Sequence, residues 1–188
     1  LRASIRKNLF LVDGSFRKDP EVRDVFRRII QSGRAFEILQ DMHELRLLGR
    51  FIPEFERIYC RAQHDVYHVY TVDTHSLFAL GELEKMKRGD YQRAYPLLSQ
   101  VAQQVEDYES LIMAALLHDI GKGWGRGHVE RGTRVVPSIL TRLGFGKKIK
   151  DAVSFLVKNH LLMAHVAQRR DLHEERTIHT IVRSVKNH

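Results

Sequence analysis

The amino-acid sequence predicts an all-α protein, a helical bundle with a buried His/Asp metal site. Three observations support this prediction. Apolar residues recur at helical spacing along most of the 188 residues, and no useful stretch alternates as a strand would. Only 4 prolines and 12 glycines interrupt the chain, which leaves room for long helices. The chain also carries 11 histidines, several of them in apolar surroundings.

The composition narrows the class of partner. The net charge of +8 suits a phosphate-bearing or acidic partner, but the basic residues are scattered and no aromatic ladder lies among them, so we expect no nucleic-acid binding. The only cysteine, Cys60, excludes an internal disulfide and a cysteine-based zinc site. No apolar run approaches the roughly 20 residues that span a bilayer, and no signal peptide opens the chain. We therefore expect a cytoplasmic protein that binds no membrane.

The first 55 residues are predicted to form a helical lead-in that packs on the core. Asp19 and Pro20 are typical of a helix start, and apolar residues then recur at helical spacing up to Gly33. A second helix is expected from about Arg34 to Leu48, with a stop at Gly49.

Residues 56–188 are predicted to form the main domain. The run Leu111–Leu117 is apolar without interruption, so the helix around it should be buried on all sides, and a glycine-rich loop follows it. The helices that we expect in this domain cover about Val66–Arg88, Tyr91–Val105 with a break or a start at Pro96, Glu109–Ile120, His128–Leu143, Lys147–Ala167 and a last one from Asp171–Glu174. Because the chain begins at Leu1 and ends within an amphipathic pattern, we expect it to be a fragment of a longer multidomain protein.

His118 and Asp119 end the buried helix. An imidazole and a carboxylate at this place need a partner, because burying them unpaired costs several kcal/mol. A divalent cation would satisfy both, and so would a hydrogen-bonded pair that caps the helix. The dipeptide alone does not distinguish the two.

Three further histidines favour the metal. His160 falls on the apolar face of its helix, His128 is in register with the apolar face of the helix that it begins, and His75 shares a face with Val72 and Ala79. Each alone could be a core or surface residue. Separate helices that each direct one histidine toward a common core indicate a metal site.

Asp171 is the last candidate ligand, and it imposes a geometric condition. On a continuous helix it would lie about 16 Å from His160. If both residues bind metal, the helix must break, and Gln168–Arg170 is the expected place. The alternative role of Asp171 is to cap the last helix, and both roles can coexist.

The ordered pattern His75, His118-Asp119 and Asp171 resembles the histidine–aspartate (HD) phosphohydrolase superfamily, with His128 and His160 similar to the extra ligands of its two-metal members. The segment from Gln63 to His75, the block from His118 to Gly123 and the blocks from Asn159 to Asp171 resemble the uridylyl-removing domain of bacterial PII uridylyltransferases. The likeness covers about Arg46 to Ile181. That family's full chain also carries a nucleotidyltransferase domain and ACT domains, and this chain shows no signature of a nucleotidyltransferase.

The resemblance implies a metal-dependent phosphodiesterase that removes UMP from the uridylylated PII signal protein, in nitrogen regulation. One or two divalent ions are implied, Mn or Mg foremost, with Fe, Zn or Co also compatible. His75, His118, Asp119 and Asp171 would hold one ion, and a bridging Asp119 with His128 and His160 the other, to activate a water that attacks phosphorus. Lys122 is the expected catalytic phosphate contact, with Arg169 and Arg170 as weaker candidates. The other interpretation of Lys122 is a solvated lysine at a helix end.

Three other interpretations of the sequence are considered. An HD phosphohydrolase could act on a free nucleotide, a cyclic dinucleotide or guanosine tetraphosphate with the same chemistry. A regulatory module could bind nucleotide without turnover, although the presence of all six candidate ligands argues against it. A purely structural helical scaffold would leave the buried histidines unexplained.

Overall fold

The structure is a computed structural model that describes residues 1–62, 69–125, 127–169, 178–179, 181–182 and 185. The described residues form helices and turns without a strand, which confirms the predicted all-α class. The helices are α1 (Arg2–Lys7), α2 (Pro20–Gln31), α3 (Ala35–Glu44), α4 (Leu47–Phe51), α5 (Pro53–Glu56), α6 (Val72–Arg88), α7 (Pro96–Gln104), α8 (Tyr108–Leu117), α9 (His128–Arg142), α10 (Lys147–Asn159) and α11 (Leu162–Arg169), with 3₁₀ turns η1 (Leu9–Leu11), η2 (Phe16–Lys18) and η3 (Ile120–Trp124).

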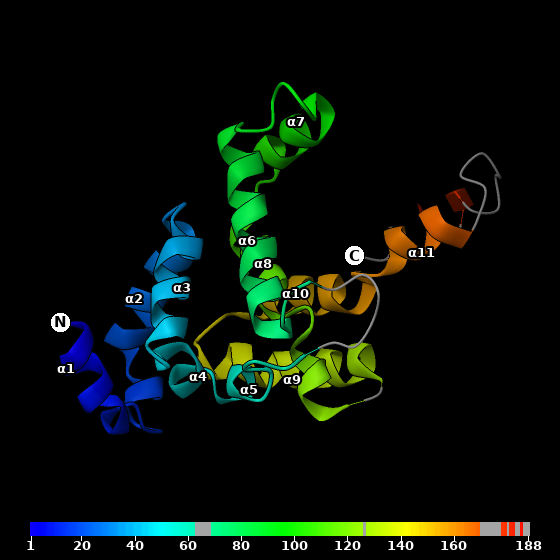
Figure 1. Ribbon diagram of the computed structural model, residues 1–188. Coiled ribbons are helices and arrows are strands. Elements are labelled where there is room, and N and C mark those ends of the chain that lie inside the picture. The colour runs from blue at the N-terminus through cyan, green and yellow to red at the C-terminus, as the bar shows by residue number, and fades with distance from the viewer. Residues whose placement is uncertain (63–68, 126, 170–177, 180, 183–184, 186–188) are drawn as a thin grey trace.

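Helices α6 and α8 stand side by side in the middle of the molecule (Figure 1). Helix α3 packs on α6, α10 packs on α8 and α9, and η3 packs on α9. One continuous apolar core joins these elements, with Phe55, Leu80, Leu116, Ile139 and Val153 among its fully or almost fully buried members. The core therefore closes around the end of α8, where the histidine–aspartate pair lies.

Helix α2 begins as predicted. The Asp19 carboxylate accepts hydrogen bonds from the backbone N–H groups of Glu21 and Val22 at 2.8 and 3.4 Å, and Pro20 is the first helical residue. Helix α6 ends as predicted, at Gly89 with φ of 85°. The sequence predicts that this helix begins at about Val66. Residues 66–68 lie outside the described residues, and residues 69–71 are described but are not helical, because α6 begins at Val72.

The predicted end of the second helix, at Leu48, is wrong. Helix α3 stops at Glu44, Arg46 adopts a left-handed conformation with φ of 65°, and α4 then runs through Gly49. Gly49 is not a helix stop but a point of close contact, because a Cβ there would lie 2.0 Å from Oε2 of Glu56. The sequence predicts a helix stop at Gly49, but in the structure the small size of this glycine serves packing within α4.

Two other elements differ from expectation. The glycine-rich segment after Asp119 winds into η3 before it opens. The helix predicted over Lys147–Ala167 breaks at His160 and Leu161, well before Gln168–Arg170, and divides into α10 and α11. His160 therefore caps α10 and does not lie mid-helix.

Residues 1–55 contact the rest of the chain through polar and apolar groups. Arg27 forms a double hydrogen bond to Glu109 at 2.6 and 2.9 Å, and Arg142 is paired with Glu54. The domain boundary after residue 55 stays a prediction.

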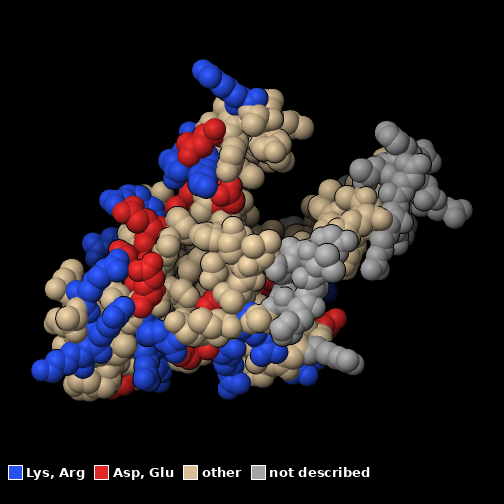
Figure 2. Space-filling model, in the orientation of Figure 1, with Lys and Arg blue, Asp and Glu red and all other residues tan. Residues whose placement is uncertain are grey.

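On the face drawn in Figure 2, basic residues are spread among acidic ones and do not gather in one patch. In the part of the chain that is described, no helix combines the length and the apolar character needed to cross a bilayer.

Candidate metal centre

Asp119 is the centre of the site. Its side chain is almost fully buried, and it lies between the end of α8 and the start of η3. Leu116 and Leu117 before it and Ile120 after it are completely buried, so the chain draws the carboxylate into the interior together with these apolar neighbours. Burial of a carboxylate is costly unless it is paired.

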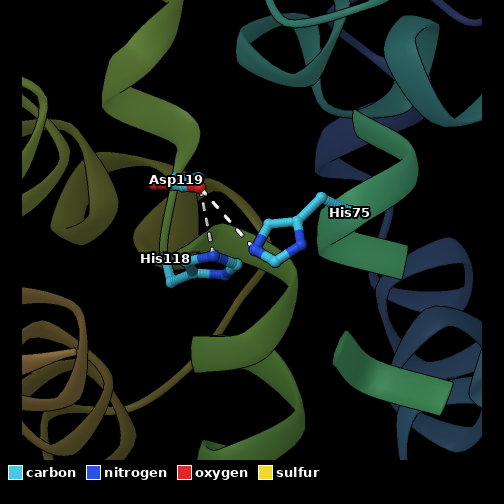
Figure 3. A group of neighbouring side chains, drawn as sticks. All are labelled: His75, His118 and Asp119. Atoms are coloured by element: carbon cyan, nitrogen blue, oxygen red, sulfur yellow. Dashed lines mark ion pairs between the residues drawn. The ribbon is translucent and has the colours of Figure 1, made fainter. Parts of the chain in front are cut away.

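Two histidines face one oxygen of this carboxylate (Figure 3). Nε2 of His118 lies 3.2 Å and Nε2 of His75 lies 4.0 Å from Asp119 Oδ2. The two imidazole rings are 5.1 Å apart between centroids. Lys122, one turn along, donates a hydrogen bond from Nζ to the same oxygen at 2.7 Å.

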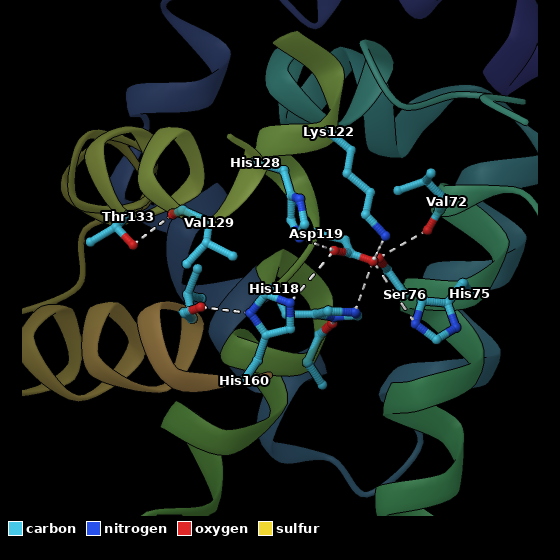
Figure 4. A network of polar contacts seen from close by, with 12 residues as sticks. Val72, His75, Ser76, His118, Asp119, Lys122, His128, Val129, Thr133 and His160 are labelled. Atoms are coloured by element: carbon cyan, nitrogen blue, oxygen red, sulfur yellow. Dashed lines mark hydrogen bonds and ion pairs between the residues drawn. The ribbon is translucent and has the colours of Figure 1, made fainter. Parts of the chain in front are cut away.

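Two other histidines face the second oxygen (Figure 4). Nε2 of His128 and Nε2 of His160 each lie 3.7 Å from Asp119 Oδ1. The His160 ring is 5.2 Å from that of His118 and 5.8 Å from that of His128. The four histidines come from α6, α8, α9 and α10, as the sequence predicted, and they surround a single carboxylate.

Gly121 explains how His128 reaches this place. A Cβ on Gly121 would lie 1.9 Å from the carbonyl oxygen of His128 and 2.5 Å from the backbone nitrogen of Gly132. Only a residue without a side chain lets η3 approach the first turn of α9 so closely. The glycine after the His-Asp pair therefore seats α9 against the site.

Backbone contacts determine which ring nitrogens face Asp119. Nδ1 of His118 lies 2.9 Å from the Ala115 carbonyl, and Nδ1 of His160 lies 2.7 Å from the Val157 carbonyl. A carbonyl oxygen only accepts, so Nδ1 carries the proton in both rings. In the neutral imidazole Nε2 is then a bare lone pair, directed at the carboxylate.

This arrangement fits a divalent cation. Two acceptors, His118 Nε2 and Asp119 Oδ2, face each other at 3.2 Å, which is unfavourable unless a further proton or a cation lies between them. Asp119 Oδ1 is buried and has no hydrogen-bond partner. The potential ligand atoms of His75, His118 and Asp119, and likewise those of Asp119, His128 and His160, lie within 4.8 Å of one another. Each of these two groups could therefore hold a divalent cation.

The electrostatics keep the site in a ligand-competent state. Burial raises the pKa of the Asp119 carboxyl, but the close contact with His118 and the hydrogen bond and charge of Lys122 outweigh burial and hold that pKa below its usual value. Burial lowers the pKa of both His128 and His160. At neutral pH the carboxylate is charged and these two imidazoles are neutral, as cation binding requires.

The remaining predicted residues are not all placed. Asp171 and Arg170 lie outside the described residues, and Arg169 is the last residue of α11, with its side chain also outside them. The roles assigned to these three residues stay predictions.

Sequence reasoning missed a second buried carboxylate next to the site. Asp73, in the first turn of α6, accepts hydrogen bonds at Oδ2 from the Cys60 backbone N–H at 2.8 Å and from His43 Nε2 at 3.0 Å. The sequence does contain a signal for Asp73, because this residue lies at the start of a helix and two positions before His75. His43 on α3 is far away in sequence and could not be paired with it by spacing.

Comparisons with known proteins show which family the chain resembles. The HD domain family matches residues 72–186. The chain is 41% identical over 188 residues, its whole length, to the bifunctional uridylyltransferase/uridylyl-removing enzyme of Azospirillum brasilense, of which it covers 20%. It is 38% identical to the enzyme of the same name from Methylococcus capsulatus, over 97% of this chain and 21% of that one. It is 39% identical to the one from Bordetella avium, over 94% and 21%.

These matches confirm the resemblance drawn from the sequence blocks. The chain spans about a fifth of the length of the curated relatives that it matches. The family match covers more than half of the chain and includes His75, the His118-Asp119 pair, His128 and His160. The chain therefore belongs to the HD domain family.

Proposed function

We propose that this domain is a metal-dependent phosphodiesterase that releases UMP from a uridylylated PII signal protein. The observation that carries the proposal is that four imidazoles from four helices face one buried carboxylate, that of Asp119. The substrate class rests on the uridylyl-removing relatives that match this chain over 94–100% of its length.

The described site residues form two groups, and each group has a proposed role. His75, His118 and Asp119 would hold one divalent cation, and Asp119, His128 and His160 a second. Such cations, Mn²⁺ or Mg²⁺ foremost, would activate water and neutralise the phosphoryl oxygens. Asp171 is proposed to complete the first group.

Lys122 is proposed as the phosphate contact. It is largely buried, with its side chain 14% exposed, and it lines the same cavity as the four histidines. An ammonium held at this depth can pair with a phosphate oxygen while remaining close to Asp119. Its position inside the cavity supports a functional role over that of a solvated lysine.

The direct test is release of UMP. We would incubate the protein with uridylylated PII in the presence and absence of Mn²⁺ and follow UMP by chromatography, beside a panel of nucleotides, cyclic dinucleotides and guanosine tetraphosphate. UMP release that depends on Mn²⁺ supports the proposal. Turnover of the panel without release from PII would instead assign another HD phosphohydrolase activity, and cation and nucleotide binding without any turnover would indicate a regulatory module.

A further inference from the structure

The cavity that contains the site extends well beyond the polar residues. Its volume is about 540 Å³, within the range of roughly 300–1,000 Å³ usual for small-molecule sites. The four histidines, Asp119 and Lys122 line one end. The remainder is lined by alanine and leucine side chains from α6, α8, α10 and the turn after α10.

The apolar lining follows directly from helical spacing. On α6, Ala79 and Leu83 lie one and two turns after His75 and share its face. On α8, Leu111 and Ala115 precede His118 on the face that opens to the cavity. The distance from residue 75 to residue 83 along the helix is about 12 Å, so the apolar part is long enough for a ring beside the phosphate.

This lining corrects one expectation from the sequence. The sequence predicts that the run Leu111–Leu117 is buried on all sides. In the structure Leu111 and Ala115 are only half-buried, whereas Ile112, Met113, Leu116 and Leu117 are fully buried. The half-buried face is the one that forms the cavity wall.

The side chains that line the apolar part of the cavity indicate what kind of group can bind there. Ala79 and Ala115 come from two helices that pack together, and their short side chains leave space, while Leu83, Leu111 and Leu156 supply apolar surface around it. Among the described lining residues, this part of the cavity has no hydrogen-bonding side chain. Such a surface favours a flat apolar group and gives nothing to a sugar hydroxyl or a second phosphate.

We propose that this apolar wall, formed by Ala79, Leu83, Leu111, Ala115 and Leu156, seats an aromatic ring carried by the phosphate ester substrate. The inference rests on the proposed function, because it places a ring next to a phosphate at Asp119. A uridylylated tyrosine offers two rings, the base and the tyrosyl ring, and each presents a flat face that the wall can contact. Recognition is by shape and burial, so the described wall should discriminate weakly between bases.

Binding measurements test this inference without turnover. In the presence of Mn²⁺, we would measure by calorimetry the affinity of the protein for methyl phosphate, phenyl phosphate and UMP. Burial of a ring should make phenyl phosphate, UMP or both bind roughly ten-fold or more tightly than methyl phosphate. The double variant Ala79→Leu/Ala115→Leu should lose that gain and keep its affinity for methyl phosphate and for Mn²⁺. Ala3→Leu, at an exposed position of α1, is the matched control and should behave as the wild type.

The outcomes separate the two proposals. Loss of the gain for UMP alone assigns the wall to the base, loss for phenyl phosphate alone assigns it to the tyrosyl ring, and loss for both supports a shared seat. If neither phenyl phosphate nor UMP binds more tightly than methyl phosphate, the inference is wrong, even when UMP is released from PII. It is also wrong if the double variant keeps the higher affinity for phenyl phosphate and UMP. If phenyl phosphate or UMP binds as expected but no UMP is released from PII, the proposed function is wrong, whereas the inference about the apolar wall is supported. Thermal unfolding of the double variant checks that it is folded.

Discussion

At the scale of single residues, the site depends on which atom of each ring points inward. The Nδ1 atoms of His118 and His160 are used by carbonyl groups one turn earlier in the chain, Ala115 and Val157. The backbone thus orients both imidazoles and leaves Nε2 for Asp119 before any ligand arrives. This preorganisation reduces the conformational entropy that a bound cation would have to remove.

Asp119→Asn tests the shared role of the carboxylate. An amide keeps the size of the side chain but loses the charge and one acceptor oxygen, so both cation groups should weaken together. We expect hydrolysis to be abolished and calorimetry to show loss of both Mn²⁺ equivalents, with a largely unchanged helical circular dichroism signal. The matched control is Asp151→Asn, whose side chain is 55% exposed on α10, and it should bind Mn²⁺ normally. An active, metal-loaded Asp119→Asn protein would refute the bridging role.

His160→Ala tests the second group separately. Only His128 and Asp119 would remain there, while His75, His118 and Asp119 are untouched. We expect the protein to lose one equivalent of metal, measured by elemental analysis after dialysis against Mn²⁺. His165→Ala removes an exposed histidine of α11 and should lose none. Unchanged metal content in His160→Ala would remove this residue from the site.

At the scale of helices and turns, residue spacing predicted the site better than it predicted the breaks. The starts of α2 and α9 and the end of α6 follow from local signals, namely an Asp-Pro pair, a glycine-rich approach and Gly89. The break at His160 and Leu161 has no glycine or proline as a local signal. The role of Gly49 depends on Glu56 of the next helix, which the sequence of α4 alone does not include.

Gly121→Ala tests how η3 and α9 meet. The new methyl group would collide with backbone atoms of His128 and Gly132, which cannot rotate away. We expect a loss of about 1–3 kcal/mol in the free energy of unfolding, measured with urea, and weaker binding at the group that contains His128. Gly146→Ala is the control, because a Cβ there meets nothing within 4 Å and its φ of −73° suits alanine. Equal stability and equal metal binding in both variants would show that the close approach is unimportant.

At the scale of the whole molecule, the sequence alone predicted the helical class and the histidines that converge, because each lies on the apolar face or at the end of a helix. It could not predict contacts between distant segments that have no repeating pattern. The pairing of His43 on α3 with Asp73 on α6 is one of these contacts, and it joins the N-terminal helices to the helix that carries His75.

That contact gives a prediction for acid stability. Burial raises the pKa of the Asp73 carboxyl, but hydrogen bonds from groups that include His43 and the Cys60 N–H lower it from 3.8 to about 2. Because the folded-state pKa lies below the unfolded one, the contribution of Asp73 is complete above about pH 4 and is lost as the pH falls towards 2. A shift of this size corresponds to about 2 kcal/mol.

Urea unfolding between pH 5 and pH 2 measures this contribution. The wild type should lose stability over the interval, and Asp73→Asn, less stable at pH 5, should show a decline smaller by about 2 kcal/mol. Asp151→Asn should keep the decline of the wild type, because its carboxylate is exposed on α10 and remote from this contact. Parallel curves for the wild type and Asp73→Asn would mean that the carboxylate is not held by His43 and the Cys60 backbone in solution. The N-terminal helices would then have to be anchored to α6 by apolar packing through Leu39 and by the Glu84 carboxylate, which accepts hydrogen bonds from the backbone N–H groups of Ala35 and Phe36 at 2.6 and 3.3 Å.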